Sequence, residues 1–301
     1  MLRKVVTGAN TSRFSCLIDG GHGEILDIFD DNFSELFHVL NDVLNIDVSI
    51  NREETIPEED LLATDILVLG CPKDFLVDHE IQEILKYIRE GGNLLIISDA
   101  GGDLANETNL NDLLSNLHIE LEPTMIRDKQ VNMGSSLAPV IENLNLSHPI
   151  MRNVMRVVVG GGCTMSMEEP AVSLLSTSMT SWIERFHPDE TEAWKVMKVG
   201  EHWSLMASVL HGQGKVIACG DVDMFSNDAD YGINALDNHI LVKNMFNWFL
   251  SPVESSTVID WLISRIAVLE KKQERLEKML KELLATNESL DQVDSVHRGG
   301  I

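Results

Sequence analysis

The sequence contains no apolar run long enough to cross a membrane and no apolar core of the kind that a signal peptide carries. Residues 1–10 instead mix charged, polar and small side chains with a few apolar ones. These absences argue against a transmembrane protein and against a secreted one. We therefore predict a cytoplasmic protein that does not insert directly into a membrane.

Cysteine is also scarce. The four cysteines, at 16, 71, 163 and 219, are widely spread and include no C-x-x-C pair. This spacing is unlike a disulfide framework or a cysteine-based structural zinc site. We predict four free thiols in a reducing compartment.

Basic residues are outnumbered two to one. The chain has 23 Lys and Arg against 48 Asp and Glu, which gives a formal net charge of −25. The field of such a protein repels phosphate backbones and anionic lipid headgroups. Nucleic acid and bare membrane are therefore excluded as expected partners. A hydrophobic content of 44% over 301 residues is nevertheless enough to form a globular core.

The first 120 residues alternate short apolar runs with amphipathic stretches. The runs at 14–18, 46–50, 66–69 and 94–98 predict strands. Apolar residues three and four positions apart over 33–44, 81–88 and 110–117 predict helices. Right-handed crossovers wind such a βα repeat into a parallel sheet between two layers of helices. The predicted fold class is therefore α/β, either flavodoxin-like or Rossmann-like.

The pattern changes after this repeat. Prolines interrupt residues 123–200, which predicts an irregular or β-rich insertion. Apolar runs at 204–210 and 215–219 flank a Gly-Gln-Gly turn and indicate a hairpin, and a helix is expected from about 236 to 250. We thus predict an N-terminal arm over 1–12 and an α/β domain over 13–252.

The most regular periodicity lies in residues 253–292, where we predict a coiled-coil helix followed by a flexible tail over 293–301. Apolar residues recur there at alternating spacings of three and four, with opposite charges beside them. We expect a homo-oligomer or a coiled-coil heteromer with another protein; a helix folded back on its own domain is the alternative. The predicted oligomerisation residues are Ile259, Leu262, Ile266, Leu269, Gln273, Leu276, Leu280 and Leu283.

Polar residues follow the predicted strands at the edge where parallel sheets bind ligands. Carboxylates and glycine amides at this edge could bind a sugar or another small polar ligand, or hold a hard cation. Alternatively, these Gly and Asp residues are turn and capping residues. The candidate ligand-binding residues are Asp19, His22, Cys71, Asp99, Gly101, Gly102, Asp221 and Asp223, the last two only if the late hairpin joins the same sheet.

Three of these candidates have competing interpretations. Cys71 could be a nucleophile with His22 as its base, but a buried cysteine acting as a small apolar residue is the commoner case. Asp221 and Asp223 could share a cation, but the rest of the calcium-loop pattern is absent and a solvated acidic turn is favoured. We assign no metal and no other cofactor.

One segment resembles a known family. Residues 212–227, which contain Gly-Asp-Val-Asp-Met-Phe-Ser at 220–226, resemble the end of the GIFT domain. That domain is shared by gliding-motility-associated ABC-transporter auxiliary proteins and a subunit of the intraflagellar transport complex. The motifs Asp-Gly-Gly-His-Gly-Glu at 19–24, Gly-Gly at 91–92, Ser-His-Pro-Ile at 147–150, Asp-Asn-His at 237–239 and Asn-Trp-Phe at 247–249 agree. The resemblance covers about residues 12–250.

The resemblance implies a fold like that of the class I glutamine amidotransferases, in which a cysteine follows the strand that corresponds to 94–98. Asp-Ala-Gly-Gly stands at that turn here, and residues 220–223 replace the expected histidine and glutamate. Loss of nucleophile and base removes the covalent route. The resemblance therefore implies a non-catalytic assembly or binding subunit, with a transport complex or a carbohydrate as expected partners. A metal-assisted or thiol hydrolase or transferase is the alternative.

Overall fold

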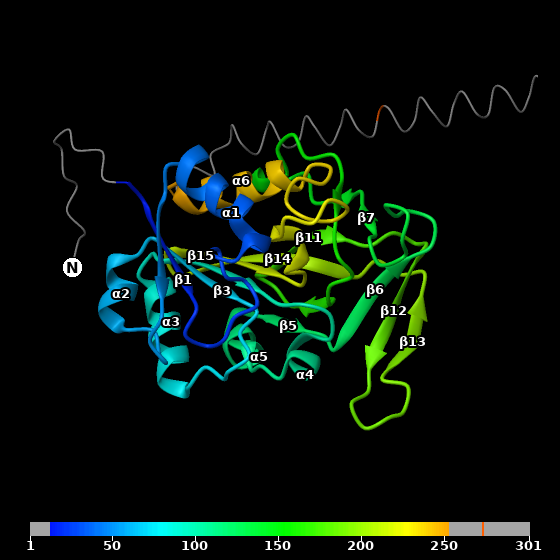
Figure 1. Cartoon of the computed structure of the whole chain (residues 1–301), viewed down its shortest axis with the longest axis horizontal. Helices are drawn as coiled ribbons and strands as arrows, with labels where there is room; N and C mark the ends of the chain where they lie inside the picture. Colours follow the sequence, from blue (N-terminus) through cyan, green and yellow to red (C-terminus); the bar gives the residue numbers. More distant parts are fainter. Residues whose placement is uncertain (1–12, 253–272, 274–301) are drawn as a thin grey trace, which may run out of the picture. The chain divides into compact units, whose positions relative to one another are not determined.

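The computed structural model describes residues 13–252 and residue 273 (Figure 1). Residues 13–145 and 150–252 belong to one compact unit, described below, while Leu146–Pro149 are assigned to a second. The predicted arm, the predicted tail and every heptad residue except Gln273 lie outside the described residues; Gln273 is helical. Within the described ranges, no helix is both long enough and apolar enough to span a membrane.

Ten of the described strands form one mixed sheet. Its parallel part runs in the order β2 (Asp47–Asn51), β1 (Ser15–Asp19), β3 (Ile66–Gly70), β4 (Asn93–Ile97) and β15 (Gly214–Cys219). Its antiparallel part continues with β14 (Ser204–His211), β10 (Met165–Met167) and β5 (Ile119–Leu121). Two further strands lie off this path: β11 (Val172–Ser176) pairs with β14, and β8 (Asn143–Leu144) pairs with β11.

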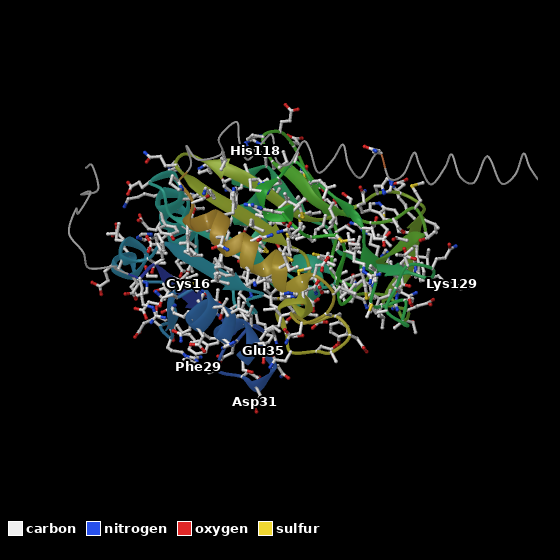
Figure 2. The ribbon with its side chains drawn as sticks, turned by 90° about the horizontal axis from the view of Figure 1, so that it is seen from above. Cys16, Phe29, Asp31, Glu35, His118 and Lys129 are labelled. Carbon is white, nitrogen blue, oxygen red and sulfur yellow. The ribbon has the colours of Figure 1, made fainter. Side chains whose placement is uncertain are left out.

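Helices cover both faces of the parallel part (Figure 1). One face carries η1 (Asp31–Phe33), α1 (Ser34–His38), η2 (Val39–Val43) and α6 (Asn238–Leu250). The other carries α2 (Glu58–Ala63), α3 (Asp78–Arg89), α4 (Gly102–Asn106), α5 (Leu110–Leu114) and η3 (Ser115–Leu117). Because both faces are covered, β3 and β4 are buried along their whole length, as their continuous apolar sequences require. Figure 2 looks onto the first face and shows α6 lying over the strands.

The insertion is β-rich, as predicted, but part of it completes the main sheet. β10 and β11 pair with β14, whereas β6 (Thr124–Asp128), β12 (Ser181–Phe186) and β13 (Trp194–Val199) form a separate three-stranded sheet. β7 (Val140–Ile141) pairs with β9 (Val157–Val158), and short helices lie at η4 (Pro149–Met151) and η5 (Asp223–Phe225). The prediction of a parallel sheet therefore holds only for the half from β2 to β15. The other half is antiparallel, beginning with β14, which a tight turn joins to β15.

The end of α6 is tied to the central strand by a buried lysine. Lys215 lies in β15 and is 3% exposed. Its Nζ donates to the carbonyl oxygens of Trp248 and Ser251 and, at 2.9 Å, to the Ser251 hydroxyl. The last carbonyls of a helix have no intrahelical donor, and a cation satisfies them and complements the helix dipole.

Candidate functional site

The first part of the site forms where β1 ends. Asp19 is the last residue of β1, and the two glycines after it turn the chain so that the His22 ring folds back onto its carboxylate. His22 Nδ1 lies 2.6 Å from Asp19 Oδ2. A Cβ at Gly21 would lie 1.8 Å from the Glu53 carbonyl oxygen, so only glycine fits there.

Residues from two other elements complete this arrangement. Asn51, at the end of β2, donates to Asp19 Oδ1 at 2.8 Å. Glu80 of α3 places Oε2 3.4 Å from His22 Nε2. Backbone amides of Ile56 and Val77 donate to the two Glu80 oxygens at 2.8 and 3.1 Å. The His22 ring, which is 2% exposed, is thus held between two carboxylates.

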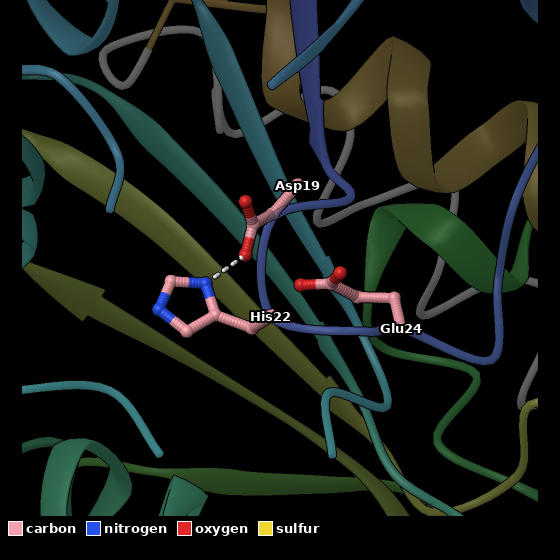
Figure 3. Close-up of side chains that lie close together, drawn as sticks. All are labelled: Asp19, His22 and Glu24. Atoms are coloured by element: carbon pink, nitrogen blue, oxygen red, sulfur yellow. Dashed lines mark hydrogen bonds and ion pairs between the residues drawn. The ribbon is translucent and has the colours of Figure 1, made fainter. Parts of the chain in front are cut away.

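A third carboxyl group faces the pair. Figure 3 shows Glu24 directed toward Asp19 and His22, and one ligand atom from each of the three residues lies within 4.8 Å of the others. Both Glu24 oxygens are buried, and the Glu24 carboxyl group shares a hydrogen bond with Asp19.

The charges of the three groups follow from these contacts. Burial alone would neutralise His22, but Asp19 and then Glu80 outweigh it and raise the His22 pKa to about 9. Burial likewise opposes the charge on Asp19, yet hydrogen bonds from His22, Glu24 and Asn51 lower its pKa to about 2. Burial, reinforced by Asp19, raises the pKa of Glu24 to about 9. At neutral pH the group therefore contains a carboxylate, an imidazolium and a neutral acid.

A second acidic group lies at the same edge, after β4 and β15. These strands pair with Ile97 opposite Cys219, which brings Asp99 close to Asp221 and Asp223. Asp221 is 1% exposed, and its Oδ2 accepts from the backbone amides of Gly160 at 3.0 Å and Met224 at 3.2 Å. Its Oδ1 is buried without a partner among the described residues.

This group contains acids without a neighbouring base. Burial, then the charges of Asp99 and Asp223, raise the pKa of Asp221 well above its ordinary value. Burial also raises the pKa of Asp99 to about 6, and it raises that of Asp223. The interpretation as a solvated acidic turn is therefore wrong for Asp221. This residue is buried because it follows β15, which lies in the middle of the sheet rather than at an edge.

Cys71 lies between the two groups, after β3. The residue is 0% exposed and has a φ of 59°. Burial raises the pKa of its thiol to about 12. His22 is directed at Asp19 and Glu80 instead, so the structure provides no support for a Cys71 and His22 pair.

The predicted residues therefore do not form one pocket. Asp19 and His22 belong to the first group and Asp99, Asp221 and Asp223 to the second. Gly101 and Gly102 have positive φ at the start of α4, where a Cβ on Gly101 would lie 2.2 Å from the Ala105 Cβ. Sequence reasoning missed Glu24, Asn51 and Glu80. Only Glu24 had a usable signal, since it stands in the same loop as His22.

An open groove of about 1020 Å³ lies near this edge. It is lined in part by the exposed apolar side chains of Phe75 and Leu104 and by the cations Lys73 and Arg185. Acidic residues, among them Asp103, also line it. The groove thus offers both apolar and hydrogen-bonding groups to a ligand or partner.

Comparisons with known proteins agree with this architecture. A family model described as the IFT52 GIFT domain matches residues 27–260. No curated protein gives a significant match. The solved structure of the mmIFT52 N-terminal domain aligns with a TM-score of 0.64 at 19% identity, over 79% of this chain and 98% of that one. A ThuA-like protein from Bacteroides uniformis aligns with a TM-score of 0.53 at 17% identity, over 82% and 96%. Identities this low bear on the fold alone.

Proposed function

The chain belongs to the IFT52 GIFT domain family, and on that premise we propose that it is a non-catalytic assembly subunit of a cytoplasmic protein complex. Membership confirms the resemblance found in the sequence. The finer parts of the proposal are that the complex serves transport and that residues 253–292 join the chain to a second copy or to another coiled-coil protein. Those residues lie outside the described ones, so their heptad pattern is the support.

The main support for a non-catalytic role is the state of the carboxyl edge. Residues 99–102, where an amidotransferase-like enzyme would carry its nucleophile, contain no thiol. The neighbouring thiol of Cys71 is fully buried, and its pKa of about 12 leaves it protonated at neutral pH. A protonated, inaccessible thiol is a poor nucleophile.

Solution mass tests the assembly role. Light scattering over a concentration series compares the full chain with a version that ends at Pro252. We expect an oligomer that becomes a folded monomer on truncation. A full chain that is monomeric at every concentration would rule out self-assembly and leave only the heteromeric form of the proposal.

Thiol reactivity tests the non-catalytic role. We expect the folded protein to release no ammonia from glutamine and to resist iodoacetamide at pH 8, whereas all four cysteines react after unfolding in urea. Rapid alkylation of Cys71 in the folded protein, with loss of a measured activity, would favour the thiol hydrolase or transferase instead.

A second candidate function is the binding of a sugar or another small polar ligand, and the groove favours it. Lys73 and Arg185 can donate, and Asp103 can accept, within one open surface. Titration with a panel of mono- and disaccharides should then raise the melting temperature in a saturable way, and Arg185→Met should abolish the rise. An unchanged melting temperature across the panel would remove this candidate.

A further inference from the structure

The small sheet of the insertion has one covered edge and one open edge. Its strand order is β13, β12 and β6, and Figure 1 shows β13 as the outermost strand at the right of the view. Along β6, the amide of Ile126 donates to the carbonyl oxygen of Gly162 at 3.2 Å, and the amide of Asp128 donates to that of Ser136 at 3.0 Å. Within the described part of the chain, β13 pairs with β12 alone. Its outer edge thus offers backbone donors and acceptors to another strand.

Exposed apolar side chains gather on this open edge. Val196, Met197 and Val199 are 62, 47 and 68% exposed. Met179 is 58% exposed, and its carbonyl oxygen would lie 3.4 Å from a Cβ on Gly200, the residue just after the strand. Single apolar residues are common on protein surfaces, but a cluster of them on an unpaired strand is typical of a site of association with another chain.

Two of these side chains share one face of the small sheet. A register shift in the pairing of β12 with β13 places Val199 opposite Trp182 and Val196 opposite Glu184. Trp182 and Glu184 are two positions apart in β12, and Trp182 Nε1 donates to Glu184 Oε1 at 3.1 Å, so both lie on the same face. A strand added along β13 would therefore cover both valines with its own alternate side chains.

The lysines of β13 do not protect this edge. Lysine commonly guards an edge strand, because its charge opposes pairing with another apolar strand. Here Lys195 forms an ion pair with Glu190, and Lys198 Nζ lies 3.5 Å from Glu201 Oε2. Residues 187–202 contain four acidic residues against these two lysines, and the acids lie on either side of the strand rather than within it. The edge is therefore apolar in its middle and acidic at its ends.

A second copy of the chain fits this edge poorly. An antiparallel pair of β13 strands that is symmetric about the middle of the strand would place Lys195 opposite Lys198 and Glu192 opposite Glu201. Like charges directly opposite each other destabilise a pair of strands. A strand with basic ends would instead be attracted by the acidic ends of the edge and by the net charge of −25.

We propose that the outer edge of β13 is a docking site for an extended segment of a different protein, which joins the small sheet as its fourth strand. The segment has alternating apolar side chains that cover Val196 and Val199, and Lys or Arg at its ends, near Glu192 and Glu201. Main-chain hydrogen bonds provide the affinity, and the apolar face determines the register. This inference rests on the proposed assembly role, for which it names one contact surface and the chemistry of the partner.

The test uses the full chain and a fluorescein-labelled peptide in which alternating Thr and Val residues are flanked by lysine pairs. Fluorescence anisotropy measures its binding. We expect saturable binding that weakens by about tenfold or more in Val199→Lys, which places a charge on the open edge. Val172→Lys is the matched control, because it makes the same change at an exposed valine of β11 in the main sheet, and it should bind as the unaltered chain does. Circular dichroism checks the fold of both variants.

Two further measurements separate strand addition from the simple attraction of charges. A peptide that is N-methylated throughout its Thr-Val core keeps the lysines but donates no backbone hydrogen bond from that core, so we expect about tenfold weaker binding or less. Hydrogen exchange followed by mass spectrometry should show slower exchange of the amides in 194–199 when the unmethylated peptide is bound.

The proposal is overturned if the unmethylated peptide does not bind, if the N-methylated peptide or Val199→Lys binds equally well, or if exchange in 194–199 is unchanged. Self-association that Val199→Lys abolishes would also overturn it, in favour of a second copy at this edge. The proposed coiled coil fails separately, since a full chain that stays monomeric in light scattering leaves peptide binding at β13 unaffected.

Discussion

Two groups of acids are buried at the carboxyl edge of one sheet, and they differ in what surrounds them. After β1, Asp19 lies against the His22 imidazolium and stays ionised. After β15, Asp221 has two backbone donors but no cationic partner that shifts its pKa, and its carboxyl group takes up a proton more readily. The first carboxylate keeps its charge because a cation compensates burial, while the second loses it because its neighbours are other acids.

The difference teaches that burial alone does not determine how a carboxyl group contributes to stability. When an ionised carboxylate is paired with a buried cation, removing either partner leaves the other charge buried without compensation. A carboxyl group that is already neutral loses little when an amide replaces it. The same substitution should therefore cost much more stability in the first group than in the second.

The largest expected effect is that of Asp19→Asn. Removal of this charge leaves the His22 imidazolium buried with only one of its two carboxylate contacts, so we expect unfolding at pH 7 to become easier by about 3–5 kcal/mol. Urea denaturation followed by circular dichroism measures the change. Asp221→Asn is the matched control, and an equal loss in both variants would contradict the distinction between the groups.

The next effect is the dependence of stability on pH. The folded-state pKa of His22 is raised from 6.5 to about 9, so its contribution is complete below pH 6.5 and is lost as the pH rises through 9. Glu24, whose pKa is also about 9, changes stability in the same direction. We expect a loss on the order of 2 kcal/mol between pH 6.5 and 9.5 in urea titrations. A flat profile over this range would show that His22 is not charged.

Asp221 should give a smaller effect that depends on the replacement. Asp221→Ala removes the acceptor of the Gly160 and Met224 amides, and we expect a loss of about 1–3 kcal/mol. Asp221→Asn keeps an acceptor and removes only the ionisable group, so a change below about 1 kcal/mol is expected at pH 7. The ratio of the two urea midpoints checks this prediction. A large loss in Asp221→Asn would mean that the carboxylate is charged and paired.

The smallest effect should be that of Glu24→Gln, which urea denaturation at pH 7 measures. Glu24 is neutral at pH 7 in the folded state but ionised in the unfolded chain, so an amide of the same shape removes the cost of protonating it, and we expect a small gain in the free energy of unfolding. A large destabilisation would place Glu24 in the ion pair with His22 rather than beside it.

The strands that position the site were predictable, since β3 and β4 are continuous apolar runs and Asp19 follows another such run. The division into two groups was not, because β3 lies between β1 and β4 and strand order depends on tertiary packing. The entry of β10 and β11 into the main sheet was also missed, since these strands are short and lie among prolines. Glu80 is distant in the sequence and meets His22 only through the folding of α3.

The buried lysine of β15 has a mechanical consequence. Since Lys215 holds the last turn of α6 through Trp248 and Ser251, tension applied to the chain beyond Ser251 acts first on these side-chain hydrogen bonds. β15 is bonded along both edges, to β4 and to β14. The Lys215 hydrogen bonds are fewer than those of the two strand ladders, so tension from this end would release the last turn of α6 before it disturbed the sheet.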